Sequence, residues 1–111
     1  MRFLYLISHD DTFVPTPELV YSVVTWTRQR KRERVLVDSQ PLQPVDEAVT
    51  VRLRRRVVRR TSGPFAPSRE KMCAYALIKA KNMDEAVEIA ATHPMAAAAT
   101  IEVRPGWEGL G

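Results

Sequence analysis

The sequence predicts an α+β fold in which an antiparallel β-sheet carries two helices on one face. The first observation is the order of patterns: segments with alternating apolar residues flank two segments with apolar residues at helical spacing. The second is size, because a chain of 111 residues has room for one hydrophobic core. The third is composition, since 45% hydrophobic and 27% charged residues are typical of folded chains. We therefore expect residues 1–111 to form a single domain, with residues 106–111 as a C-terminal tail.

The first strand and the first helix are predicted in the N-terminal third. Residues 3–7 are apolar on both faces of a two-residue period, which suits a strand that is covered on both sides. Thr16 suits the N-cap of a helix, and Pro17 suits its first turn. Apolar residues recur at helical spacing as far as Thr27, and we expect the helix to end near Glu33.

The middle of the chain predicts a short strand, a hairpin and a further strand. Residues 35–42 form the short strand, and Pro41 places it at an edge or a bend of the sheet. Residues 49–61 predict a hairpin with its tip at Arg55 and Arg56, a pair that lacks the Asn-Gly or Asp-Gly chemistry preferred in tight turns. Residues 73–79 alternate again and predict the next strand.

The last third predicts a second helix and a final strand. Asn82 suits an N-cap because an acid follows three residues later. The apolar face of this helix runs over residues 83–91, and Pro94 closes it. Residues 95–99 read as a small-residue connector, and residues 100–104 read as the last strand.

The predicted order of elements, βαββαβ with an additional hairpin, is that of the ferredoxin-like split βαβ fold. Both helices of this fold cover the same face of the sheet. The first and last strands are too apolar to leave the other face in water, and large apolar patches usually mark an interface. We therefore expect a homodimer in which two sheets pack face to face across a two-fold axis.

The positive charge of the chain is concentrated in the predicted hairpin. Lys and Arg number 17 against 13 Asp and Glu, and six arginines lie within residues 52–60. Such a cluster could neutralise the phosphates of a nucleic acid. Arginines that alternate with valines also protect an exposed strand edge, and the hairpin has no aromatic residues to stack on bases. We therefore do not expect a nucleic acid as the main partner, and keep it as an alternative.

The cellular setting is predicted from cysteine usage and hydropathy. The single cysteine, Cys73, allows no internal disulfide and favours a reducing compartment. The apolar run at the N-terminus is too short for a signal peptide, and no window is long enough for a membrane span. We expect a cytoplasmic protein without a membrane partner.

Residues 61–70 form the longest stretch that reads as neither helix nor strand. Gly63 permits unusual backbone angles, and Pro64 and Pro67 fix the backbone and remove hydrogen-bond donors. We expect the stretch to be an ordered wall of a pocket or interface, with Phe65 buried and with Arg52 or Arg104 facing Glu102 as a buried ion pair. The predicted binding residues are Ser62, Phe65, Ser68, Arg69, Glu70, Arg52 and Arg104.

The same stretch carries a resemblance to a known family. Residues 61–70 read Thr-Ser-Gly-Pro-Phe-Ala-Pro-Ser-Arg-Glu and resemble the DGPF signature of the YCII-related family, usually Thr-Asp-Gly-Pro-Phe-Ala-Glu-Thr-Lys-Glu. Residues 83–90, Met-Asp-Glu-Ala-Val-Glu-Ile-Ala, are similar to the family's Leu-Asp-Glu-Ala-Ile-Glu-Trp-Ala. Residues 101–105 are similar to its closing Val-Glu-Val-Arg-Pro. The resemblance runs from about Phe3 to Pro105 and implies the dimeric α/β-barrel assembly of ferredoxin-like subunits.

Departures from the family pattern bear on catalysis. Ser62 replaces the acid of the signature, and Pro-Ser-Arg at residues 67–69 replaces its Glu-Thr-Lys. Relatives with a proposed catalytic role carry a His in the first helix and an Asp before a Pro after the second helix. Here residues 16–33 contain no His, and His93 stands before Pro94. The resemblance therefore does not carry an enzymatic role to this chain.

The catalytic candidates that remain are His9, Asp10 and His93. His9 and Asp10 end the first strand, where a His beside an acid could act as a general base. Successive strand residues point to opposite faces, so we expect a solvated loop there. His93 suits a cationic His at a helix C-terminus. Cys73 reads as a small buried hydrophobe, Trp26 and Trp107 as core or interface residues, and no metal or cofactor is expected because a metal site needs three or four ligands.

Together these observations predict a cytoplasmic homodimer that binds a small molecule or serves as an accessory module, without a complete catalytic dyad. One alternative is a lyase or hydrolase that acts on an acidic or phenolic compound through His9 or His93 with Asp10. The other is an electrostatic nucleic-acid binder that uses residues 52–60.

Overall fold

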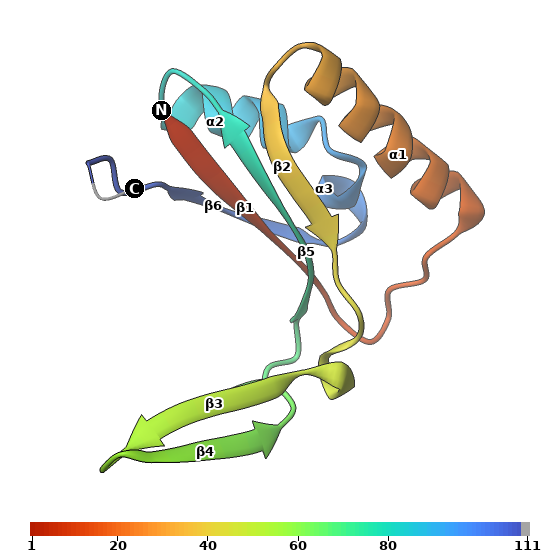
Figure 1. Cartoon of the computed structure of the whole chain (residues 1–111). Helices are drawn as coiled ribbons and strands as arrows, with labels where there is room; N and C mark the ends of the chain where they lie inside the picture. Colours follow the sequence, from red (N-terminus) through yellow and green to blue (C-terminus); the bar gives the residue numbers. More distant parts are fainter. Residues whose placement is uncertain (110–111) are drawn as a thin grey trace.

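The computed structural model describes residues 1–109, and its elements follow the predicted order with two additions, η1 and α3 (Figure 1). The strands and helices are β1 Arg2–His9, α1 Pro17–Arg32, β2 Leu36–Pro41, the single-turn η1 Val45–Glu47, β3 Val49–Arg54, β4 Val57–Ser62, β5 Lys71–Lys79, α2 Met83–Ala91, α3 Pro94–Ala98 and β6 Thr100–Pro105.

Four strands form one antiparallel sheet in the order β2-β5-β1-β6. This is the ferredoxin-like arrangement, and it confirms the predicted fold class. β2, which contains Pro41, is an edge strand, as expected from the missing N–H of proline. The helices lie on one face of the sheet, and β3 and β4 form a separate hairpin that stands away from it (Figure 1).

Side-chain caps explain where the two long helices begin. Thr16 accepts a hydrogen bond from the backbone N–H of Leu19 at 3.2 Å, and Pro17 occupies the first turn of α1. Asn82 accepts from the backbone N–H of Glu85 at 2.9 Å and caps α2. Both predicted caps are confirmed. Glu33 is the C-cap of α1, which confirms its predicted end.

The predicted connector over residues 95–99 is wrong, because Pro94–Ala98 forms a short helix, α3. His93 is its N-cap and accepts a hydrogen bond from the backbone N–H of Met95 through Nδ1 at 3.0 Å. Proline suits the first position of a helix as well as the end of the preceding one, and alanine is the best helix former. Pro94 therefore starts a helix as well as closing α2.

The core lies between the sheet and the helices. Phe3, Tyr5 and Ile78 are fully buried on this side. The Tyr5 hydroxyl donates to the backbone oxygen of Ala86 in α2 at 2.5 Å, which ties β1 to α2. Burial raises the pKa of Tyr5 to about 12, so this hydroxyl stays protonated as a donor.

The opposite side of the sheet carries no helix, and we call it the open face. Side chains that pair across strands point to the same side, which places Leu4 with Leu77, Leu6 with Tyr75 and Ser8 with Met72 on the open face. Most of these side chains are only half-buried. The apolar open face expected from the sequence is therefore present.

The β3–β4 hairpin, residues 49–62, extends from the body, and we call it the arm (Figure 1). Its tip has positive φ at Arg55 (50°) and Arg56 (67°), as in a type I′ turn. Every residue of β4 is exposed. The radius of gyration is 15.8 Å, against about 13 Å for a compact chain of roughly this length. The chain alone is therefore extended by its arm. No helix in residues 1–109 is long and apolar enough to cross a membrane.

Candidate functional site

Two cavities lie on opposite sides of the sheet. The open-face cavity, of about 650 Å³, lies between the open face and the 64–68 segment. The helix-side cavity, of about 350 Å³, lies between the sheet and the helices. Both volumes fall in the range of roughly 300–1,000 Å³ that is usual for small-molecule sites.

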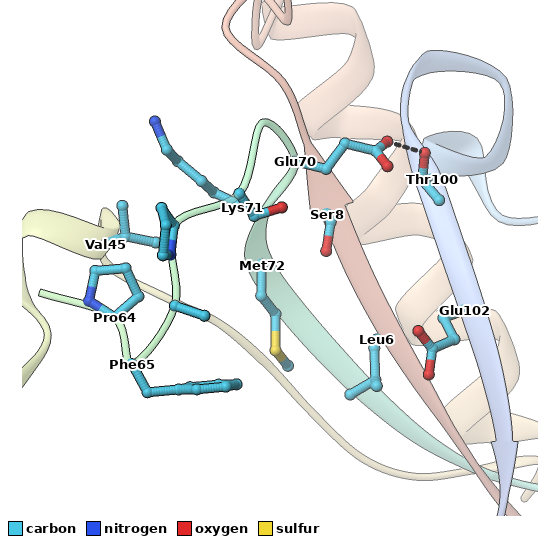
Figure 2. A pocket seen from close by; sticks show the side chains of 13 residues that line it. Leu6, Ser8, Val45, Pro64, Phe65, Glu70, Lys71, Met72, Thr100 and Glu102 are labelled. Atoms are coloured by element: carbon cyan, nitrogen blue, oxygen red, sulfur yellow. Dashed lines mark hydrogen bonds between the residues drawn. The ribbon is translucent and has the colours of Figure 1, made fainter. Parts of the chain in front are cut away.

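The open-face cavity contains part of the predicted binding set (Figure 2). Figure 2 shows the 64–68 segment on one side and Leu6, Met72 and Glu102 projecting from the strands on the other. Glu70 accepts a hydrogen bond from the Thr100 hydroxyl, which links the end of the segment to β6. Of the predicted binding residues, Phe65, Ser68 and Glu70 line the cavity, and Ser62, Arg69, Arg52 and Arg104 fall outside its lining.

Two expectations for this segment are wrong in the single chain. Phe65 is 79% exposed rather than buried, although it lines the open-face cavity. Arg104 lies 3.6 Å from Glu102, but both side chains are exposed, since they project from the same face of the edge strand β6. Arg52 reaches the backbone oxygen of Phe65 at 3.5 Å instead of an acid. In the part of the chain that the structure describes, no buried ion pair therefore holds the segment.

The helix-side cavity brings together residues that are far apart in the sequence. His9 at the end of β1, Trp26 in α1, Cys73 in β5 and His93 before α3 all line it. Among residues 1–109, no Asp, Glu, Lys or Arg contributes to its lining. The two histidines thus share one cavity, while the 61–70 stretch lies at the other.

His93 is 4% exposed and is held neutral. Burial lowers its pKa from 6.5 to about 4, because the charged ring would lose its hydration. The expectation of a cationic His at a helix C-terminus is therefore wrong. Since Nδ1 accepts from Met95, the proton of the neutral ring is on Nε2.

The Nε2–H of His93 has no hydrogen-bond partner among residues 1–109. Among the described residues, every side-chain nitrogen or oxygen atom that is sealed from solvent has a hydrogen-bond partner. The unpaired Nε2–H is therefore not sealed from solvent. Because His93 lines the helix-side cavity, this unpaired N–H is a candidate donor for a ligand there.

His9 and Asp10 do not form a His–carboxylate pair. The Nδ1 of His9 lies 2.9 Å from the backbone oxygen of Asp10, and the ring stacks on Phe13 with centroids 4.5 Å apart. The Asp10 carboxylate instead accepts from the hydroxyl and the N–H of Thr12, and these bonds lower its pKa. Within residues 1–109, no carboxylate oxygen lies within 4.0 Å of a ring nitrogen of His9 or His93.

The thiol and the indole rings differ in burial. Cys73 is half-buried with its Sγ 3.4 Å from the backbone oxygen of Ile7, and burial raises the pKa of its thiol. Trp26 is buried, donates from Nε1 to Thr92 at 2.9 Å and meets His93 edge-on. Trp107 is 81% exposed, so it is not a core residue.

Among the described residues no group of three His, Cys, Asp or Glu side chains could hold a metal ion.

The arginines of the arm do not all lie on one face. The pairing of Arg52 with Arg59 and of Arg54 with Val57 places three arginines on one face. Arg60 pairs with Val51 on the other face. Arg55 and Arg56 are at the tip. The cluster is therefore split between surfaces rather than forming a single basic track.

Several cavity residues were not singled out as binding residues from the sequence. Val23, Trp26 and Thr27 share one side of α1 because they are spaced three and four residues apart, a signal that was present in the sequence. Ala74 reaches the cavity only through the tertiary fold, which pairs β5 with β1. No local pattern could have placed it in one cavity with His93.

Comparisons with known proteins agree with the fold. A family model described as the YCII-related domain matches residues 1–108. No curated protein matches the chain. One similar solved structure is 5-chloro-2-hydroxyhydroquinone dehydrochlorinase from Burkholderia phenoliruptrix AC1100 in complex with 2,5-dihydroxybenzoquinone. It has a TM-score of 0.51 at 14% identity over 98% of this chain and 96% of the other, a likeness of fold.

Proposed function

Because the chain belongs to the YCII-related family, we propose that it is a homodimeric small-molecule-binding protein whose ligand occupies the helix-side cavity. The observation that carries the proposal is the neutral, buried His93, which offers an Nε2–H donor at the wall of an apolar cavity. Small-molecule sites are built in this way, with mostly apolar walls and a few polar groups that orient the ligand.

The lining defines the class of ligand. A charged molecule would lose its hydration without gaining a counter-ion, since no Asp, Glu, Lys or Arg lines the cavity. The rings of Phe13 and Trp26 favour a flat ligand. The ligand is therefore a neutral molecule of about one aromatic or quinoid ring, with an oxygen that accepts from His93. The bound quinone of the structurally similar dehydrochlorinase is a ring of this size.

The open-face cavity has a different role in the proposal. Its outer wall is the exposed Phe65, and its inner wall is part of the apolar open face. When two open faces pack together, the second subunit covers this cavity and buries Phe65. The predicted binding residues Phe65, Ser68 and Glu70 then become interface residues.

Catalysis by His9 or His93 with Asp10 is not part of the proposal. A general base needs its partner within hydrogen-bond reach, and Asp10 is engaged by Thr12. A cytoplasmic location, as expected from the single cysteine, is retained as part of the proposal.

A matched pair of probes tests the cavity. Benzamide and benzoate have the same shape, but only benzamide is neutral at pH 7. In ligand-observed NMR titrations of the protein, benzamide should bind saturably and benzoate at least about tenfold more weakly, because the cavity has no counter-ion.

Two substitutions in α1 provide the control. Thr27 lines the cavity and Thr25 is exposed on the same helix. Thr27→Leu fills the cavity and should abolish benzamide binding, whereas Thr25→Leu should leave it unchanged. Equal binding of the two probes, or full binding by Thr27→Leu, would overturn the proposed site.

A further inference from the structure

We propose that the arm is a clasp whose apolar face packs on a second copy of this chain, beside the sheet-to-sheet contact of the homodimer. The inference rests on the homodimer of the proposed function, and it adds an interface and a role for the hairpin.

The arm has two unlike faces. The cross-strand pairs Val49 with Ser62, Val51 with Arg60 and Leu53 with Val58 share one side. This apolar face therefore consists of three valines and a leucine, with one arginine and, at the base, one serine. The opposite, polar face carries Thr50, Arg52, Arg54, Val57, Arg59 and Thr61.

The chain itself does not cover the apolar face. Val51, Leu53 and Val58 are 64%, 61% and 62% exposed. The hydrogen bonds from the arm to the remaining chain come from its polar face, where Thr50 donates to the backbone oxygen of Gly63 at 2.8 Å and Arg52 to that of Phe65 at 3.5 Å. A two-stranded hairpin alone is marginally stable in water, so this face needs a partner surface.

Charge identifies a second copy as the occupant. The arm holds six of the 17 Lys and Arg residues and no Asp or Glu, so its formal charge is +6. The rest of the chain has 11 Lys and Arg against 13 Asp and Glu, or −2. The arm and the body are therefore complementary, but within one chain the arm points away from the body (Figure 1).

The open face offers the matching surface. Leu4, Leu6 and Leu77 supply apolar area, and Glu102 and Asp38 on neighbouring strands supply acids. Arg60 is the one base within the apolar face of the arm and needs such an acid when that face is buried. Two-fold symmetry makes the contact reciprocal, since each arm clasps the other body.

Two substitutions of the same kind test the clasp. Val51 and Val57 are both exposed, at 64% and 55%, but lie on opposite faces of the arm. Val51→Lys should raise the dimer dissociation constant about tenfold or more, measured by analytical ultracentrifugation at several concentrations. Val57→Lys adds the same charge on the opposite face of the arm and should leave the constant unchanged.

A second measurement reads the contact directly. In dimers mixed from isotope-labelled and unlabelled chains, filtered NOEs should connect the Leu53 methyls with open-face protons of the other copy. A stable dimer without such NOEs, and with Val51→Lys unaffected, would overturn the clasp and leave the sheet-to-sheet dimer intact. A monomeric wild type would overturn both the clasp and the sheet-to-sheet dimer. The benzamide titration would then still test the helix-side cavity on its own. If the wild type binds duplex DNA in a salt-dependent way and Val51→Lys weakens that binding, the partner of the apolar face is a nucleic acid instead.

Discussion

His93 combines three properties that rarely occur together at one residue. It caps α3 through Nδ1, it is buried and neutral, and it lines a cavity with no charged residues. The cap fixes the tautomer, because a ring nitrogen that accepts a backbone N–H cannot also carry the proton. The remaining N–H is thus oriented before any ligand arrives, which reduces the entropic cost of binding.

The depressed pKa of His93 predicts a pH dependence of stability. The unfolded chain takes up this proton below pH 6.5 and the folded chain only near pH 4, so the contribution is fully present above pH 6.5 and is lost as the pH falls toward 4. His93→Asn keeps an N-cap side chain but cannot titrate. From pH 7 to pH 5, the unfolding free energy of the wild type should fall by roughly 2 kcal/mol relative to that of the variant. Urea denaturation at both pH values measures it.

Carboxyl groups common to both proteins cancel in that difference. A difference that is the same at both pH values would mean that His93 is hydrated in the folded protein, and the proposed donor would lose its basis.

At the residue scale, the sequence could name His9, Asp10 and His93 but not their environments. The two histidines are 84 positions apart, and only the pairing of β1 with its neighbours and the packing of α3 bring them to one cavity. The charge state of His93 follows from burial, a tertiary property. Phe65 shows the reverse problem, since its apolar character predicted burial that the single chain does not provide.

The arm is the element that most departs from the compact fold. Its tip places two arginines at positive φ, where a side chain with a Cβ costs about 1–2 kcal/mol and glycine costs little. Such a turn suits an element that is stabilised by a partner surface more than by its own chain.

Relief of this strain should stabilise the arm. Arg56→Gly removes the Cβ at φ 67° and should increase the hydrogen-exchange protection of the amides of β3 and β4 about fivefold or more. Arg56→Ala loses the same charge but keeps the Cβ, so it serves as the control and should not increase the protection. An equal effect of both substitutions would point to charge repulsion among the arginines instead of backbone strain.

At the element scale, the strands and both long helices were predictable because their caps and periods are local. Thr16 and Asn82 signal helix starts through hydrogen bonds that span three residues, and Pro17 fits the first turn. The helix α3 was missed because Pro94 has two valid readings, as the end of one helix and the start of another. The tip at Arg55 and Arg56 was located correctly by the alternation of the flanking strands, although its residues are unfavourable for the turn.

In the whole molecule, the sheet separates two surfaces of different character. Its helix side holds the core and the cavity with His93, and its open face carries an apolar surface, the exposed Phe65 and, beside them, the arm. In the proposed homodimer the open faces and arms bury each other, which leaves both helix-side cavities accessible. The sequence could predict the fold class and the apolar open face because both follow from element order and period. It could not predict the cavity, whose lining is drawn from six separate segments.

The most direct test of the account is a protein-observed titration with benzamide, followed in ¹⁵N and ¹³C correlation spectra. The account predicts saturable shifts at the His93 ring, the Met95 amide and Ala74, all of which belong to the helix-side cavity, with no saturable shift along residues 64–68. Shifts confined to residues 64–68, or no saturable shift at His93, would contradict it.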